Sequence, residues 1–216
     1  MYVPPAFAEM DTTVLHDFMV QNSFATLVSV AKPSAVASHL PLLLDRSTGP
    51  YGRLIGHMAR ANPHWEQADG QEVLAIFTGP HAYISPSWYH VKNAVPTWNY
   101  IAVHAYGTFR LNDNRDRTLE IVRDSVESYE AKSKTPWSLG DADAEFIDRL
   151  LDAIVGFDFD IQRIEGAWKL SQNHAPERRQ GVIHGLKDAG EEQQRQIAEL
   201  MSSEPTNGDP SAGIAF

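Results

Sequence analysis

Cysteine is absent from this sequence of 216 residues, which excludes disulfide bonds, thiolate catalysis and zinc sites built on cysteine. Long apolar runs are absent as well. A run such as 40–44 falls far short of the roughly 20 residues that a membrane-spanning helix needs. The first residues show no basic segment followed by an apolar one, so we expect no secretory signal. A soluble, cytoplasmic protein is therefore the expectation.

Clustered basic residues are also scarce. The chain has 18 Lys and Arg against 28 Asp and Glu, a formal net charge of −10 and a pI near 5.3. Arg178 and Arg179 form the only adjacent basic pair. Because a duplex-binding surface needs grouped cations to displace counterions from phosphates, direct nucleic-acid binding is not expected.

The common nucleotide-binding and catalytic signatures are missing. The patterns G-x-G-x-x-G and G-x-x-x-x-G-K-[ST] do not occur, which argues against Rossmann and P-loop folds. G-x-S-x-G and H-E-x-x-H do not occur either, so neither a serine nucleophile nor a zinc site is indicated. The sequence nominates no catalytic residue and no metal site.

The sequence does contain a first half rich in strands. Helical spacing predicts a helix from Asp11 to Asn22, and alternating apolar residues predict strands after it. Pro41 removes one ladder donor, so the second strand should lie at a sheet edge or a bulge there. The predicted strands are 24–30, 35–44, 53–59, 72–79, 82–85 and 98–111, with a short helix at 62–68.

The second half is predicted to be mostly helical. Helices are expected at 114–131, 141–155, 176–189 and 190–201, with a strand at 157–164 that resumes at 168–170 after a Glu-Gly turn. In the second of these helices Phe146, Leu150, Leu151 and Ile154 form the apolar stripe. The pattern predicts an α+β fold with an antiparallel barrel. It also predicts one domain over residues 1–201 and a disordered tail at 202–216.

Four segments are unusually dense in polar and aromatic residues. They are S-H-L-P from Ser38, G-H-M-A-R-A-N-P-H-W from Gly56, G-P-H-A-Y-I-S-P-S-W-Y from Gly79 and V-P-T-W-N-Y from Val95. A plain core does not need this combination of side chains.

With the Met-Tyr-x-Pro start and K-L-S-Q-N from Lys169, these segments resemble the PaiB family of FMN-binding transcriptional regulators. The match runs from Met1 to about Leu186. The resemblance implies an antiparallel split β-barrel with flanking helices and bound FMN. It further implies a homodimer, with the flavin across the subunit interface, and negative regulation of transcription.

The residues themselves nominate a phosphate site where the strand 53–59 leads into the short helix. Arg60 offers a guanidinium fork, and Asn62 and nearby backbone N–H groups add donors. The alternative is a surface arginine beside an ordinary Asn cap. His39 and His57 are candidates for flavin hydrogen bonds or are structural. Ser85 is a further donor or a turn cap.

Aromatic and polar residues elsewhere nominate the walls of a flavin pocket. Trp88 and Trp98 suit an aromatic wall, a core or a dimer interface. Thr97 and Asn99 share the strand face opposite Trp98 and can hydrogen-bond a flavin edge or phosphate. Lys169 is a second wall of the site or a strand end. The complete set of predicted FMN-binding residues is His39, His57, Arg60, Asn62, Ser85, Trp88, Thr97, Trp98, Asn99 and Lys169.

Three functions stay open. The first is a PaiB-like negative regulator that acts through flavin-dependent sensing, since no helix-turn-helix with a basic recognition helix is visible. The second is a flavin-dependent oxidoreductase of a small molecule, in which the flavin carries the redox chemistry. The third is a carrier of haem or another ligand, which one of the nine histidines would hold.

Overall fold

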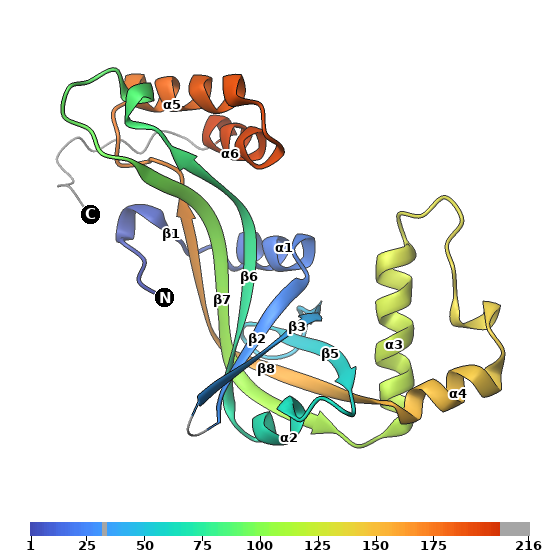
Figure 1. Cartoon of the computed structure of the whole chain (residues 1–216). Helices are drawn as coiled ribbons and strands as arrows, with labels where there is room; N and C mark the ends of the chain where they lie inside the picture. The colour runs from blue at the N-terminus through green and yellow to red at the C-terminus, as the bar shows by residue number, and fades with distance from the viewer. Residues whose placement is uncertain (32–33, 204–216) are drawn as a thin grey trace. The chain divides into compact units, whose positions relative to one another are not determined.

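The computed structural model describes residues 1–31 and 34–203, and eight strands form the framework of this part of the chain (Figure 1). The strand pairs with a defined register are antiparallel. The strands are β1 (Ala8–Glu9), β2 (Phe24–Ala31), β3 (Ser34–Pro41), β4 (Leu43–Asp45), β5 (Arg53–Ala59), β6 (Glu72–Ile84), β7 (Thr97–Asn112) and β8 (Ile154–Lys169).

Helices connect and flank the strands. Asn114 caps one of them through its side chain, which accepts hydrogen bonds from the backbone N–H groups of Asp116 and Arg117. The α-helices are α1 (Thr12–Gln21), α2 (His64–Ala68), α3 (Arg115–Glu130), α4 (Ala144–Asp152), α5 (Pro176–Ala189) and α6 (Glu192–Ser203). Three short 3-10 helices are η1 (Pro5–Phe7), η2 (Pro86–Tyr89) and η3 (Leu139–Asp141). No helix in the described ranges is long and apolar enough to cross a bilayer.

The strands form one sheet in the order β3-β2-β6-β7-β8-β5-β4, with β1 beside β8. β3 ends at Pro41 and lies at one edge of this order, as the missing ladder donor of that proline predicts. Within the described residues the sheet does not close on itself. The predicted α+β fold with an antiparallel sheet is confirmed.

The chain packs as two compact units. Of the described residues, the first unit comprises Met1–Leu15, Thr78–Val103 and 165–203, and the second comprises His16–Phe77 and His104–Ile164. β6, β7 and β8 each contribute one end to each unit. Each unit therefore has its own stretch of three long strands and its own packing partners.

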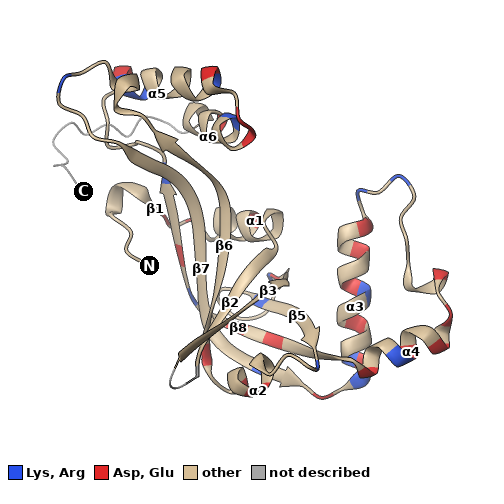
Figure 2. Ribbon diagram, viewed as in Figure 1, with Lys and Arg blue, Asp and Glu red and all other residues tan. Residues whose placement is uncertain are grey.

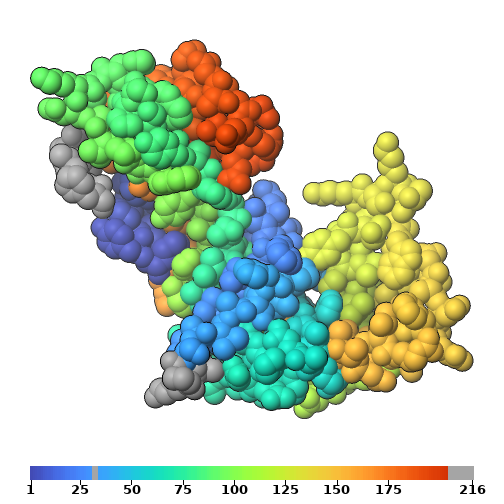
Figure 3. Space-filling model, viewed as in Figure 1, coloured from blue at the N-terminus to red at the C-terminus, as the bar shows by residue number. Residues whose placement is uncertain are grey.

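In the first unit, α5 packs against α6 and η2. Gly185 of α5 lies directly against the Trp88 indole of η2, and a Cβ at that position would collide with the ring. Figure 3 shows the orange-red surface of α5 and α6 beside the green surface of the segment that contains η2. Trp88 thus anchors η2 to the helices.

In the second unit, phenylalanine side chains fill the core. Phe77, Phe109, Phe157 and Phe159 are fully buried, and the rings of Phe109 and Phe157 stack with their centroids 4.6 Å apart. Burying a ring of this size from water stabilises the fold by about 1.5–3 kcal/mol. These rings come from β6, β7 and β8, so they hold the strand ends of this unit together.

Two predicted strand breaks do not occur. The predicted strands 72–79 and 82–85 are one strand, β6, because the backbone of Gly79-Pro80 stays extended. Proline removes one N–H donor but its φ is compatible with a strand. The predicted Glu-Gly turn is likewise part of β8, since Gly166 and Ala167 pair with Glu9 and Ala8 of β1. That pairing partner lies too far away in sequence for local patterns to predict it.

The predicted helix 141–155 is shorter. α4 ends at Asp152, because Ile154 pairs with Ala59 of β5 and begins β8. Of the predicted apolar stripe Leu151 is buried, whereas Phe146 and Leu150 are 47% and 48% exposed. The last helix ends at Ser203, so residues 202 and 203 of the predicted disordered tail are helical. Residues 204–216 lie outside the described residues.

Candidate functional site

A hydrogen-bonded polar cluster lies inside the second unit, at the N-terminal end of α2. The His64 ring is fully buried and has a hydroxyl at each nitrogen: Ser38 Oγ at 2.8 Å from Nδ1 and Ser29 Oγ at 2.9 Å from Nε2. Asn62 Nδ2 donates to Ser38 Oγ at 3.0 Å, and Asn62 Oδ1 accepts from the backbone N–H of His64 at 3.0 Å. The Asn62 amide therefore has partners at both ends.

Burial lowers the pKa of His64, because the charged imidazolium loses its hydration in the interior. The neutral ring has one N–H donor and one acceptor nitrogen, which matches its two hydroxyl partners. This cluster ties β2 and β3 to the start of α2. Both ring nitrogens of His64 and both ends of the Asn62 amide have hydrogen-bond partners, which is typical of a structural network.

Arg60, the predicted phosphate ligand, lies in the same unit and is exposed. Its Nε donates to the carbonyl of Asp152 at 2.8 Å, and one Nη donates to the carbonyl of Ile154 at 2.9 Å. These carbonyls lie where α4 ends and β8 begins, a position where a cation also complements the helix dipole. The contacts favour a capping role for Arg60.

The two predicted strand histidines differ in environment. His39 on β3 is exposed, and its Nδ1 lies 3.0 Å from Thr26 Oγ1. His57 on β5 is largely buried, its Nδ1 has no hydrogen-bond partner among the described residues, and burial lowers its pKa. Neither histidine contacts the His64 cluster through a hydrogen bond in this part of the chain.

The first unit presents an exposed aromatic surface on β6 and β7. Trp98 is 53% exposed, and its ring lies 5.9 Å from Tyr83 in an edge-to-face arrangement and 6.1 Å from His81. Tyr100, two residues further along β7, faces the same side as Trp98 because side chains alternate along a strand. We call the set His81, Tyr83 and Trp98 the aromatic surface, and Tyr100 lines the cavity described below.

A partly buried cation lies beside Thr97 in the same unit. Lys169, the last residue of β8, donates from Nζ to Thr97 Oγ1 at 2.7 Å, and no acidic partner for Lys169 occurs among the described residues. Burial lowers its pKa. The pKa of His174 is lowered by burial first and then by the positive charges of Arg178 and Lys169. This part of an acidic protein is locally positive.

Asn99 lies on the buried side of β7, away from this surface. Its Nδ2 donates to Ser171 Oγ at 3.0 Å and contacts Met201 Sδ at 3.4 Å, and its side chain is completely buried. Ser85 is the N-cap residue of η2, where its Oγ lies 2.7 Å from Ser87 Oγ. With Trp88 packed on α5, these three predicted residues have structural partners in the first unit.

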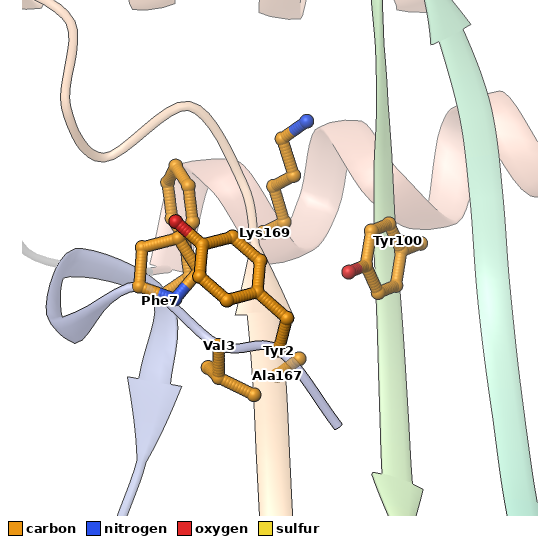
Figure 4. A pocket seen from close by; sticks show the side chains of 7 residues that line it. Tyr2, Val3, Phe7, Tyr100, Ala167 and Lys169 are labelled. Atoms are coloured by element: carbon orange, nitrogen blue, oxygen red, sulfur yellow. The ribbon is translucent and has the colours of Figure 1, made fainter. Parts of the chain in front are cut away.

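A cavity of about 130 Å³ opens at the N-terminal segment of the first unit (Figure 4). Its walls come from the segment before β1, from β7 and from β8. In Figure 4 the Tyr100 hydroxyl points toward β8, which carries Ala167 and Lys169. The lining residues are Tyr2, Val3, Pro4, Phe7, Tyr100, Ala167 and Lys169.

The structure thus brings Thr97 and Lys169 together, leaves Trp98 beside Tyr83 and His81, and places Asn62 with residues that the prediction omitted. Sequence reasoning missed Ser29 and His64 of the polar cluster, and Tyr2 and Phe7 of the cavity. His64 lies inside the quoted motif, so its signal was present. Tyr2 also lies in the Met-Tyr-x-Pro start, but no local pattern placed Tyr2 or Phe7 at a cavity, because their neighbours in β8 are more than 150 residues away in sequence.

Comparisons with known proteins identify the family of the chain. Residues 1–163 match the family described as "Putative FMN-binding domain". The chain is 36% identical over 202 residues to the protease synthase and sporulation protein PAI 2 of Bacillus subtilis, covering 93% of this chain and 96% of that protein. An uncharacterised protein of Emericella nidulans is 31% identical over 241 residues, with the same coverage of each chain.

Two solved structures share the fold at low identity. The flavocytochrome Anf3 from Azotobacter vinelandii aligns with a TM-score of 0.56 at 12% identity, over 75% of this chain and 69% of that one. The FAD and heme binding protein from Mycobacterium smegmatis aligns with a TM-score of 0.58 at 13% identity, over 75% and 73%. The likeness shows that this chain shares the fold of these two structures, an antiparallel split barrel.

Fold and family together define a class, the FMN-binding split-barrel proteins. Within that class the chain belongs to the family of FMN-binding domains that includes PaiB-type proteins. The prediction of FMN as the cofactor is confirmed by this membership.

Proposed function

We propose that the protein is a cytoplasmic homodimer that binds FMN on the aromatic surface of the first unit and acts as a PaiB-like negative regulator through flavin-dependent sensing. The observation that carries this proposal is the exposed ring of Trp98, which lies 5.9 Å from Tyr83 and 6.1 Å from His81. An exposed planar indole suits a flat ring system.

The residues of the first unit suit a flavin chemically. Trp98 and Tyr83 offer ring faces and edges, and His81 lies beside Trp98. When bound, FMN supplies the redox chemistry, while these side chains hold and orient its ring and limit its contact with water. The exposed fraction of Trp98 gives a bound ring apolar area to cover.

A second copy of the chain is part of the proposal because the cavity is small. Ligand pockets that enclose a drug-sized molecule measure roughly 300–1,000 Å³, well above the 130 Å³ found in the first unit. A partner subunit would supply the missing walls. Light scattering coupled to size-exclusion chromatography should give twice the monomer mass of 24.1 kDa, and a monomer that binds FMN with full affinity would contradict this part.

The regulatory part of the proposal rests on relatives and on charge. PAI 2 of Bacillus subtilis is named for protease synthesis and sporulation. Figure 2 shows Lys and Arg interspersed with Asp and Glu on α3 to α6, without an extended basic stripe. This pattern favours an indirect effect on transcription. A gel-shift assay should detect no complex that weakens steeply with salt, and such a complex would favour direct DNA binding.

A flavin-dependent oxidoreductase is the second candidate, and the cavity beside Tyr100 favours it because an enzyme needs a place for a substrate. The two candidates differ in turnover. Bleaching of the bound flavin by NAD(P)H, followed by reoxidation with a small-molecule acceptor, would favour the enzyme. A flavin that stays oxidised would favour the sensor.

The decisive experiment for FMN binding is a titration of apoprotein with FMN, read by flavin absorbance and fluorescence. Stacking of a planar ring on an aromatic side chain is worth about 1–3 kcal/mol. Trp98→Ala should therefore weaken FMN binding by about 30-fold, the equivalent of about 2 kcal/mol.

Trp137→Ala is the matched control, because Trp137 is also partly exposed, at 43%, but lies in the second unit. It should keep the wild-type affinity. Equal affinities for the two variants would remove Trp98 from the site, and an unchanged flavin spectrum in the wild type would refute FMN binding.

A further inference from the structure

The cavity of the first unit has walls of two chemical kinds. Tyr2, Phe7 and Tyr100 contribute aromatic rings, and Val3, Pro4 and Ala167 add apolar surface. Lys169 is the one charged residue in the lining. The walls therefore suit a ligand with an apolar body and one negatively charged group.

The segment that carries Tyr2 and Phe7 is held in place by β8. Ala8 and Glu9 of β1 pair with Ala167 and Gly166, and the Met1 α-ammonium forms an ion pair with Glu165. Phe7 is buried, whereas Tyr2 is 80% exposed. The cavity thus has one fixed aromatic wall at Phe7 and one wall at Tyr2 that borders the solvent.

The charge in the cavity has no acidic partner among the described residues. Lys169 Nζ is hydrogen-bonded to Thr97 Oγ1, a hydroxyl, and to no carboxylate among the described residues. An ammonium group has three N–H donors, so Lys169 keeps donors for a ligand. Burial lowers the pKa of Lys169, and burial followed by the positive charges of Arg178 and Lys169 lowers the pKa of His174. A bound anion would favour the charged form of both groups.

Size and polarity narrow the ligand class. A cavity of about 150 Å³ lined by apolar side chains binds benzene, so about 130 Å³ suits one six-membered ring. A phosphate dianion would lose much of its hydration against three aromatic rings with only one cation to compensate. A single carboxylate on a small ring needs one ammonium group and apolar walls, which this cavity has.

We propose that this cavity binds a small aromatic monocarboxylate of the size of benzoate, with the carboxylate on Lys169 Nζ and the ring among Tyr2, Phe7 and Tyr100. The inference deepens the proposed function by naming a ligand class, and it rests on that function in treating FMN as the occupant of the aromatic surface. It assigns Lys169 to the small acid.

The test is calorimetric titration of apoprotein and of FMN-loaded protein with benzoate and with benzyl alcohol, which has the same ring and no charge. Benzoate should bind at least about tenfold more tightly than benzyl alcohol, because a charge-assisted contact is stronger than a neutral one. Lys169→Met, which keeps the length of the side chain, should abolish this preference. Lys92→Met, a change at an exposed lysine of the first unit, should keep it.

The outcomes separate the two proposals. Benzoate binding to apoprotein with loss of the preference in Lys169→Met supports the cavity, even if wild-type protein fails to bind FMN. Equal affinities for benzoate and benzyl alcohol in the wild type overturn it without any variant. Displacement of FMN by benzoate, or a Lys169→Met variant that loses FMN and retains the preference for benzoate, also overturns it.

Discussion

The two units use polar side chains in opposite ways. In the second unit His64, Ser29, Ser38 and Asn62 satisfy one another inside a buried cluster. In the first unit Lys169 has a hydroxyl partner and no acidic one among the described residues, beside aromatic rings that face solvent.

Burial and a full set of hydrogen-bond partners distinguish a structural polar cluster from a binding surface. A buried polar group with all its partners stabilises one conformation and has no donor left for a ligand. A partly exposed cation and an exposed indole gain contacts when a ligand arrives. The second unit is therefore expected to control stability and the first to control affinity, and each prediction below tests that division.

The largest change in the free energy of unfolding should come from His64→Ala. The change removes two hydrogen bonds, leaves Ser29 and Ser38 with unmade bonds and opens a space in a packed interior. We expect the free energy of unfolding to fall by about 3 kcal/mol, measured by urea denaturation, while the FMN affinity of the folded protein stays within threefold of the wild type.

His184→Ala is the control for this change, since His184 is an exposed residue of α5 whose ring lies beside Asp188 at the surface. It should change stability by less than about 0.5 kcal/mol. If His64→Ala instead lowered FMN affinity strongly without a loss of stability, the polar cluster would belong to a binding site and the division between the units would fail.

The sequence predicted much of the fold because alternation and helical spacing are local signals. The limits of the strand 53–59 and of the helix 176–189 agree with β5 and α5. What failed were features set by distant partners. The pairing of β1 with β8 turns a predicted Glu-Gly turn into a strand, and the pairing of Ala59 with Ile154 ends α4 early.

The candidate site was harder to predict, because a motif does not reveal which of its polar residues are buried. Asn62 and Asn99 lie in similar polar and aromatic segments, yet both have internal partners. Their neighbours in the sequence differ from them. Thr97 accepts a hydrogen bond from Lys169, and Trp98 is exposed to solvent. Telling these cases apart required the tertiary structure, since strand twist and helix packing decide the environment of each residue.

A smaller loss of stability is expected when the pH falls below 6.5. Burial lowers the pKa values of His57, His64 and His174 from 6.5. Below pH 6.5 the unfolded chain binds protons that the folded chain does not. The free energy of unfolding therefore keeps its full value above pH 6.5 and declines as the pH falls toward the folded-state pKa values. Each such histidine contributes at most about 1.4 kcal/mol per pH unit.

Urea midpoints measured from pH 7.5 to 5.5 test this dependence. His57→Asn removes a titrating ring whose Nδ1 lacks a hydrogen-bond partner in the described structure, and should flatten the decline. His174→Asn should do the same from the first unit. A decline as steep in both variants as in the wild type would mean that other groups cause the pH dependence.

The smallest effect, and the sharpest test of the division, should come from Arg60→Ala. Its two hydrogen bonds to the carbonyls of Asp152 and Ile154 lie at an exposed position, so the free energy of unfolding should fall by only about 1 kcal/mol. FMN affinity should stay within threefold, because the guanidinium edge that would grip a phosphate already binds carbonyls. Arg60→Lys, which keeps the charge and loses the planar fork, should lose similar stability. A drop in FMN affinity of more than about tenfold in Arg60→Ala, equivalent to about 1.4 kcal/mol, would restore the predicted phosphate role and extend the binding surface to the second unit.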